Sequence, residues 1–315
     1  MAGLSPTITT GEFVGLTRRT RSRVERPTFS VPLFIRMAKF AMPIGLTGSA
    51  SFIINTGDRL ILPHYGSLAD LGIYVLAYKL GMLISVAYSS FQIYWGAQAF
   101  NIMKREDSGD VFARLFTYML VGVSFCGLGL VVAARPIITI FAAPAFRGAA
   151  ALVPLIVTAY CMRSIGDFLG VLFMVEGRPG YQAVCTWVGA ALCVAGYLIL
   201  IPRYGIWGAA IATAGAFFVL TAITGAWVYR LRPYRIEGAR TVKIGVALIG
   251  GSVAHVLLPS GSLPHQIGSG ALSLAVFPLT LWVMRFPTGG ELQAGLAEIA
   301  SLAKRVVPKL ARETD

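Results

Sequence analysis

One pair of opposite charges stands inside an apolar run of this 315-residue chain. Arg163 and Asp167 lie in ALVPLIVTAYCMRSIGDFLGVLFMV, four residues apart, so on a helix they share one face, one turn from each other. A charge in hydrocarbon is costly and usually faces a bundle interior or a wet cavity. Two interpretations stay open: a self-neutralised ion pair that fixes helix packing, or a central cation, Arg163, that meets an anionic substrate.

A second charged group follows the first apolar stretch. Asp58 and Arg59 are adjacent, so on a helix they point away from each other and do not neutralise themselves. Lys79 lies about two turns into the next stretch, where it could pair with Asp58 across a helical hairpin or snorkel to the interface. Tyr74 and Tyr78 stand nearby at helical spacing, which favours an aromatic belt at the membrane surface over a sugar-stacking surface.

The sequence holds no constellation typical of catalysis or metal binding. Its three histidines, His64, His255 and His265, do not stand at metal-ligand spacing with another ligand. It has no Gly-rich phosphate loop and no nucleophile elbow. We therefore predict that the protein is not an enzyme, and that it has no catalytic residue, metal or cofactor. The cysteines all fall in apolar runs and are expected to be isolated buried thiols: Cys126, Cys161, Cys185 and Cys193.

The composition predicts a membrane protein. Hydrophobic residues make up 56% of the chain, charged residues only 13%, and the mean hydropathy is +0.71, whereas soluble domains carry about 25% charged residues. Stretches of about 20 mostly apolar residues can span a bilayer as helices. We predict an all-α, polytopic bundle with eight such spans: 33–55, 72–98, 112–134, 150–174, 181–202, 205–229, 241–259 and 268–285.

The basic residues orient the predicted bundle. With the N-terminus in the cytoplasm, 21 of the 27 lysines and arginines lie on the cytoplasmic side, as the positive-inside rule requires. This predicts N-in and C-in, with a basic cytoplasmic segment at 1–32, the membrane bundle at 33–285 and a cytoplasmic amphipathic tail at 286–315. The tail is expected to lie on anionic lipid or to pack on a partner. The net charge of +13 then reflects orientation and lipid, and no nucleic acid is expected.

Two motifs carry a family resemblance. GDRLILPHYGSLADLGIYVLAYKLG (57–81) resembles the start of the second lobe of polysaccharide flippases of the Wzx/PST type. These belong to the MOP exporter superfamily, with the MATE transporters and the lipid II flippases. GRPGYQAVCTWVGAALCVAGYLILIPRYGIWGAAIAT (177–213) is similar to the helix pair of that family that is joined by Ile-Pro-x-Tyr-Gly. The resemblance covers 33–285 and corresponds to the second lobe of a MATE-like fold, the C-terminal half alone.

The resemblance implies a flippase of the bacterial inner membrane. Such a protein moves a polyprenyl-pyrophosphate-linked oligosaccharide between leaflets for cell-surface polysaccharide synthesis, which includes lipopolysaccharide O-antigen. Because the first six-helix bundle has no counterpart, we expect a fragment of a longer frame, a half that pairs with a partner half, or a decayed remnant. Two other functions stay open: a non-transporting structural membrane subunit or inactive remnant, and, less favoured, a membrane enzyme of lipid-linked sugar assembly.

The resemblance and the depth of the charges together select the candidate site. Asp58, Arg59 and Tyr74 match the family motif, and Lys79 matches a position that is often polar there; Arg163 is a cavity candidate by its depth. The expected substrate-binding residues are Arg163, Lys79, Arg59, Tyr74 and Tyr78. The expected ion-coupling residues, or structural charge partners, are Asp167 and Asp58.

The orientation can be tested with a reporter fused after Ser262, between the last two predicted spans. We expect the reporter to lie outside the cytoplasm, because an N-in chain with this distribution of Lys and Arg places that connection on the outer side. Activity of paired reporters that work on only one side of the membrane measures this. A cytoplasmic reporter would contradict the predicted topology.

Overall fold

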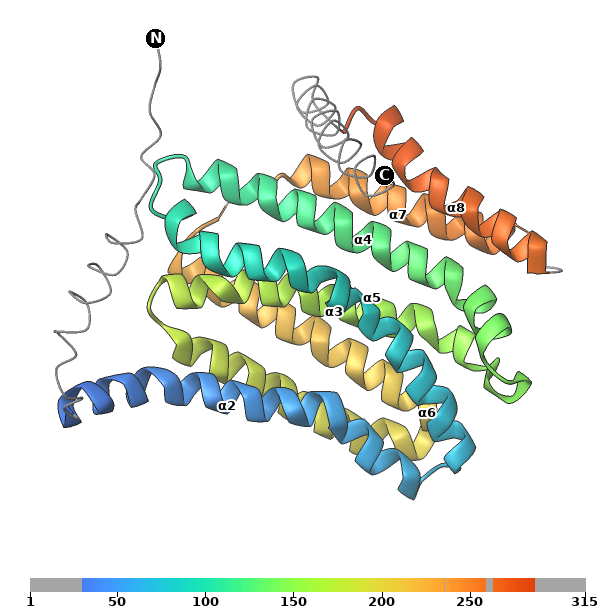
Figure 1. The fold of residues 1–315 in the computed structure, drawn as a ribbon, viewed down its shortest axis with the longest axis horizontal. Helices are drawn as coiled ribbons and strands as arrows, with labels where there is room; N and C mark the ends of the chain where they lie inside the picture. Colours follow the sequence, from blue (N-terminus) through green and yellow to red (C-terminus); the bar gives the residue numbers. More distant parts are fainter. Residues whose placement is uncertain (1–29, 235, 259–262, 287–315) are drawn as a thin grey trace, which may run out of the picture. The chain divides into compact units, whose positions relative to one another are not determined.

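The computed structural model describes residues 30–234, 236–258 and 263–286. Most of the predicted segments 1–32 and 286–315 lies outside these residues. The described chain is all-helical, without a strand, and six of its helices, α3 to α8, are long and apolar enough to cross a membrane. The helices are α2 (Val31–Ile61), α3 (Leu68–Ile102), α4 (Ser108–Phe141), α5 (Ala149–Val175), α6 (Pro179–Leu231), α7 (Gly238–Leu257) and α8 (Leu263–Val283), with short 3-10 turns at η1 (Leu62–His64) and η2 (Pro144–Phe146) (Figure 1).

The 53-residue helix α6 is a hairpin of two antiparallel arms. Its backbone breaks at Gly205, where φ is 54° and ψ is −129°, a conformation that glycine adopts readily. The hydroxyls of Tyr197 and Thr213 are 2.9 Å apart, although sixteen residues of continuous helix would separate them by about 24 Å. A Cβ on Gly196 would lie 2.9 Å from the Cβ of Ala212, so small residues let the arms pack closely.

The eight predicted stretches correspond to eight helical segments of the described chain once the arms of α6 are counted separately. The stretches 181–202 and 205–229 are these two arms. The stretch 33–55 forms α2, which is not among the six candidate spans found in the described residues. Helix formation there is confirmed, while its membrane crossing stays a prediction.

The chain divides into two compact units, Met1–Pro43 and Ile44–Asp315. All of the candidate residues belong to the second unit. Within that unit, α5 packs against α3, α4 and α6, while α7 and α8 pack on each other and on α4. This arrangement makes α5 the central helix, and α5 carries Arg163 and Asp167.

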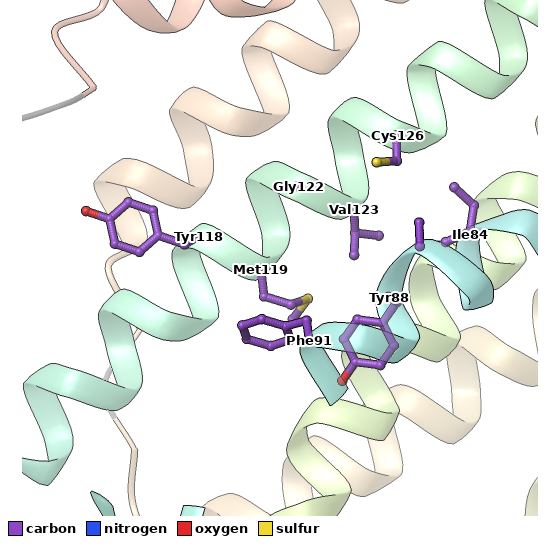
Figure 2. Close-up of a pocket in the computed structure, with 9 residues that line it drawn as sticks. Ile84, Tyr88, Phe91, Tyr118, Met119, Gly122, Val123 and Cys126 are labelled. Carbon is purple, nitrogen blue, oxygen red and sulfur yellow. The ribbon is translucent and has the colours of Figure 1, made fainter. Parts of the chain in front are cut away.

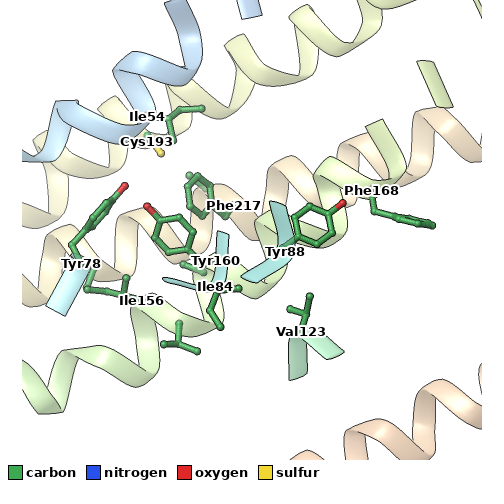
Figure 3. Close-up of a cluster of buried hydrophobic side chains, with 14 of the residues drawn as sticks. Ile54, Tyr78, Ile84, Tyr88, Val123, Ile156, Tyr160, Phe168, Cys193 and Phe217 are labelled. Carbon is green, nitrogen blue, oxygen red and sulfur yellow. The ribbon is translucent and has the colours of Figure 1, made fainter. Parts of the chain in front are cut away.

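An aromatic cluster fixes α5 against α3 and α4. The indole N–H of Trp95 donates to the carbonyl oxygen of Phe168 at 3.0 Å, and the two rings stack with centroids 4.7 Å apart. Phe112 of α4 packs on both rings. Figure 3 shows Phe168 with other members of the buried cluster, which extends along α3 and α5 to Tyr78. The cluster therefore sets the depth at which α5 holds its charges.

A local signal fixes the start of α3. The Ser67 hydroxyl accepts the backbone N–H of Asp70 at 3.1 Å, while the Asp70 carboxylate accepts the backbone N–H of Ser67 at 3.2 Å. This reciprocal capping box satisfies two N–H groups that the first turn of a helix leaves without partners. It sets where α3 begins and therefore the register of Tyr74 and Tyr78.

The cysteines agree only in part with the expected buried thiols. Cys185 and Cys193 are buried, Cys161 is partly buried and Cys126 is exposed. The prediction is wrong for Cys126, because an apolar run in a membrane helix can face outward as well as inward.

The hairpin turn of α6 can be tested by substituting Gly205. We expect Gly205→Ala to lower the free energy of unfolding by about 1–3 kcal/mol, because an L side chain is strained at this positive φ. Thermal unfolding in detergent measures the change. The matched control is Gly215→Ala in the second arm, where a Cβ meets no atom within 4 Å. Equal stability of both variants would contradict the assignment of Gly205 as the turn.

Candidate functional site

Asp58 is a buried anchor between α2 and α3. Its side chain has no exposed surface, and its carboxylate accepts the Tyr74 hydroxyl at 2.6 Å and the backbone N–H of Arg59 at 2.8 Å. Lys79 is exposed instead, so the pairing of Asp58 with Lys79 is wrong. Five residues after Tyr74, Lys79 lies about 140° further around α3 and leaves the buried face.

The predicted aromatic belt is also wrong. Tyr74 and Tyr78 are 0% and 1% exposed, and both face the bundle interior. The Tyr78 hydroxyl donates to the side-chain oxygen of Asn55 at 3.4 Å, and the guanidinium carbon of Arg59 lies 4.6 Å from the centre of the Tyr78 ring. This face of α3 packs mainly against α5, where the Tyr78 ring lies 5.6 Å from the Tyr160 ring, so both rings are buried. Their hydroxyls bond Asp58 and Asn55, and their predicted contact with substrate stays a prediction.

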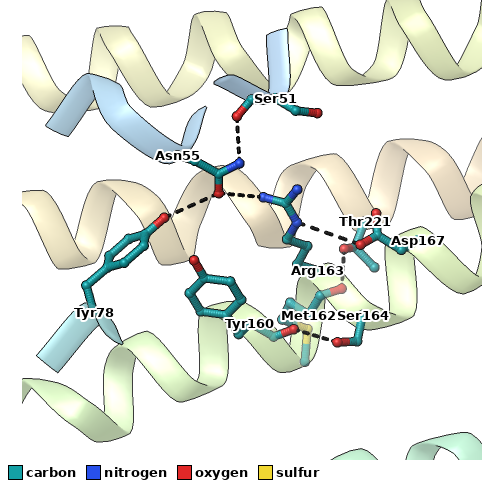
Figure 4. Close-up of polar contacts among 9 residues, drawn as sticks. All are labelled: Ser51, Asn55, Tyr78, Tyr160, Met162, Arg163, Ser164, Asp167 and Thr221. Carbon is teal, nitrogen blue, oxygen red and sulfur yellow. Dashed lines mark hydrogen bonds and ion pairs between the residues drawn. The ribbon is translucent and has the colours of Figure 1, made fainter. Parts of the chain in front are cut away.

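Arg163 lies at the centre of the second group, shown in Figure 4. Its Nε is 3.7 Å from Oδ2 of Asp167, so the predicted pairing along one face of α5 is confirmed. Its Nη1 donates to Oδ1 of Asn55 at 3.0 Å, and its guanidinium carbon lies 5.3 Å from the centre of the Phe217 ring. Nη2 makes no hydrogen bond to any side chain or backbone group of the described residues.

A small polar hollow of about 70 Å³ opens beside this cation. It lies between α2, α5 and both arms of α6, and Gln182 places a buried side-chain oxygen there that has no partner among the described residues. Polar walls and this volume suit bound water. The polar residues that line it are Thr47, Ser51, Arg163, Asp167, Gln182, Thr186 and Thr224.

Asn55 joins the two groups of candidate residues, although it is not among the site residues predicted from the sequence. Its Oδ1 accepts both Tyr78, from the group around Asp58, and Arg163. Asn55 lies one helical turn before Arg59, on the same face of α2. This spacing could have identified Asn55 as a candidate site residue from the sequence. Lys79 takes no part in this network. The Arg59 side chain enters it only through the Tyr78 ring, and its Nε is buried without a hydrogen-bond partner in the described chain.

Two larger cavities have mostly apolar walls. One, of about 210 Å³, lies between α3 and α4 and is lined by Ile84, Phe91 and Met119, among others; Figure 2 shows it. The other, of about 580 Å³, lies between α4, α5 and α7. Neither contains Arg163 or Asp167, so of these three cavities only the polar hollow is lined by the interior ion pair.

Comparison with solved structures identifies the fold. No protein-family model and no curated protein matches the sequence. The chain is similar to a structure of the lipid II flippase MurJ in an inward closed conformation, with 14% sequence identity and a TM-score of 0.66 over 88% of this chain and 61% of that one. The chain therefore spans about three fifths of that structure. It has the all-helical, multi-pass fold of that structure, and membership of the polysaccharide-flippase family stays a prediction.

The role of Asp58 as an anchor can be tested by Tyr74→Phe. We expect this variant to lose about 1–3 kcal/mol of stability, because a buried carboxylate oxygen loses its hydroxyl donor. Thermal unfolding in detergent measures the loss. Tyr94→Phe on the exposed side of the same helix is the control, since Tyr94 is 53% exposed. The anchor would be ruled out by a Tyr74→Phe variant as stable as the control.

Proposed function

We propose that this chain is the membrane-embedded part of a transporter that moves a lipid-linked oligosaccharide across the bacterial inner membrane. In this proposal Arg163 receives the pyrophosphate that links lipid to sugar. One observation carries it: an interior guanidinium keeps a free donor, Nη2, beside a polar hollow, in a fold similar to that of a lipid II flippase. The transfer between leaflets involves no covalent chemistry, so no catalytic residue or cofactor is invoked.

The geometry of the interior ion pair supports a role beyond packing. Arg105 and Asp107, which are exposed, form a two-pronged contact with N–O distances of 2.8 and 2.9 Å. In the interior, Arg163 and Asp167 approach only to 3.7 Å. The Arg163 and Asp167 side chains are 21% and 35% exposed, and an ion pair largely withdrawn from water stabilises a fold only when its geometry is good and its remaining donors are satisfied. Arg163 meets neither condition, whereas its planar fork suits a phosphate.

The remaining candidates receive separate proposed roles. Asp58 and Tyr74 hold α2 to α3 and act as structural residues. Arg59 and Tyr78 form a second cationic position nearer the predicted outer end, where Arg59 could assist the departing head group. Lys79 has an exposed side chain, so its substrate contact would require a surface supplied from outside the described residues.

Asp167 is the proposed coupling residue. When an anion binds Arg163, the Asp167 carboxylate loses its only charged partner on α5, and a carboxylate withdrawn from bulk water is disfavoured without such a partner. Uptake of a proton or another cation would compensate for this loss, and it would couple substrate binding to the movement of that ion.

The rest of the proposed transporter lies beyond this lobe. The chain covers 61% of the MurJ structure, and we propose that an N-terminal bundle or a partner half completes the cavity. The basic segment 1–32 and the tail 286–315 are proposed to lie on the cytoplasmic surface against anionic lipids. A non-transporting subunit or remnant is the alternative, and glycan export by the complete transporter separates the two.

The central variant is Arg163→Ala in the complete transporter. We expect it to abolish export of the cell-surface glycan, because the pyrophosphate loses its interior cation, while protein abundance stays unchanged. Glycan labelling at the cell surface and immunoblots measure the two quantities. Arg147→Ala, at an exposed position, is the matched control and should export normally.

Folding is controlled with the double variant Arg163→Ala, Asp167→Asn, which leaves no unpaired charge at this position. We expect it to fold and still fail to export. Undiminished export by either variant would contradict the cation's role. Failure of the unmodified transporter itself to export would favour the non-transporting alternative.

A further inference from the structure

We infer that Asn55 is the residue that positions Arg163, by holding the guanidinium so that Nη2 faces the polar hollow. The inference rests on the proposed function for its purpose, but its geometry stands alone. Asn55 belongs to α2, whereas Arg163 belongs to α5, so the contact is a tertiary one across 108 residues of sequence.

The amide of Asn55 is itself held in one orientation. Its Nδ2 donates to the backbone carbonyl of Ser51 at 2.7 Å, a bond within α2. This bond directs Oδ1 away from α2, toward the guanidinium of Arg163 at 3.0 Å and the hydroxyl of Tyr78 at 3.4 Å. A flipped amide would place an NH₂ group against the guanidinium, with two donors facing each other. The arrangement therefore assigns a fixed acceptor to Nη1.

Two acceptors hold two of the three guanidinium nitrogens. Asn55 takes Nη1, and Asp167 lies beside Nε at 3.7 Å. Because the guanidinium is planar and rigid, fixing these two nitrogens also fixes the direction of Nη2. Figure 4 shows Arg163 between Asn55 on one side and Asp167 on the other. Without Asn55, Nη1 would lose its acceptor and become free, and Nη2 would lose its fixed direction.

A neutral amide suits this task better than a second carboxylate. Asn55 accepts a hydrogen bond without cancelling the charge of Arg163, so the cation keeps its attraction for an anion. An aspartate at this position would hold the guanidinium equally well but would neutralise it. The two variants therefore test two effects separately. Asn55→Ala removes the acceptor that positions Arg163, whereas Asn55→Asp keeps an acceptor but neutralises the charge that attracts an anion.

The experiment measures the reaction of Arg163 with phenylglyoxal, a reagent that needs the guanidinium nitrogens free. The full chain is purified in lipid nanodiscs, and mass spectrometry gives the modification rate at Arg163 relative to the exposed Arg147. We expect Asn55→Ala to raise this ratio several-fold, and Asn55→Asp to leave it at or below that of the unmodified protein. Ser49→Ala is the matched control on α2, since Ser49 is exposed and bonds only to its own helix, and it should change nothing. An unchanged ratio in Asn55→Ala, with normal thermal stability, overturns the inference.

A second arm adds inorganic pyrophosphate as the probe. We expect pyrophosphate to protect Arg163 in the unmodified protein. In Asn55→Ala the concentration needed for protection should rise roughly tenfold, the effect of losing one hydrogen bond to a charged group. In Asn55→Asp it should rise further, because the charge is neutralised. Absence of protection in the unmodified protein contradicts the proposed function, while the modification rates still decide the role of Asn55. Equal protection of the unmodified protein and Asn55→Ala counts against the inference.

Discussion

The structure depends on how a guanidinium is kept charged inside an apolar helix bundle. Removing Arg163 from bulk water is costly, and the described chain compensates with a carboxylate, an amide oxygen and an aromatic ring, contributed by α5, α2 and the second arm of α6. These contacts leave one guanidinium nitrogen, Nη2, without a hydrogen bond in the described chain. Arg163 also lines a polar hollow with room for water.

The helices around Arg163 are organised by contacts that keep this position open. The Asp58–Tyr74 bond sets the α2–α3 hairpin, and the break at Gly205 folds α6 back on itself. The stack of Trp95 on Phe168 fixes the depth of α5. Each contact involves only one or two residues. Together they bring segments that are more than a hundred residues apart in sequence to one polar hollow.

Much of this fold could be predicted from the sequence, because membrane helices are specified by length and hydropathy. The eight stretches and the shared face of Arg163 and Asp167 follow from the 1.5 Å rise and 3.6-residue turn of a helix. The tight link at IPRYG marks the turn of α6. The family resemblance predicted a membrane bundle like one lobe of the MOP exporters, and the fold is similar to that of the MurJ structure.

The partners of the charges could not be predicted, because they depend on how neighbouring helices rotate about their axes. An apolar stretch does not say which face is turned inward, so Tyr74 and Tyr78 were expected at the membrane surface and Lys79 was one possible partner of Asp58. In the structure Asp58 accepts a hydrogen bond from Tyr74, and Lys79 is exposed. Asn55 was overlooked because a neutral amide draws less attention than a charge, although it joins both groups.

The central claim is that the Arg163 guanidinium meets a pyrophosphate. Solid-state NMR can test it through dipolar coupling between ¹⁵N-labelled arginine side chains and the ³¹P nuclei of an added prenyl pyrophosphate, in bilayers containing the full chain. The account predicts a coupling that shows direct contact and that disappears when Arg163 is replaced by glutamine. A coupling that survives this replacement, or none above that given by a prenyl alcohol, would contradict it.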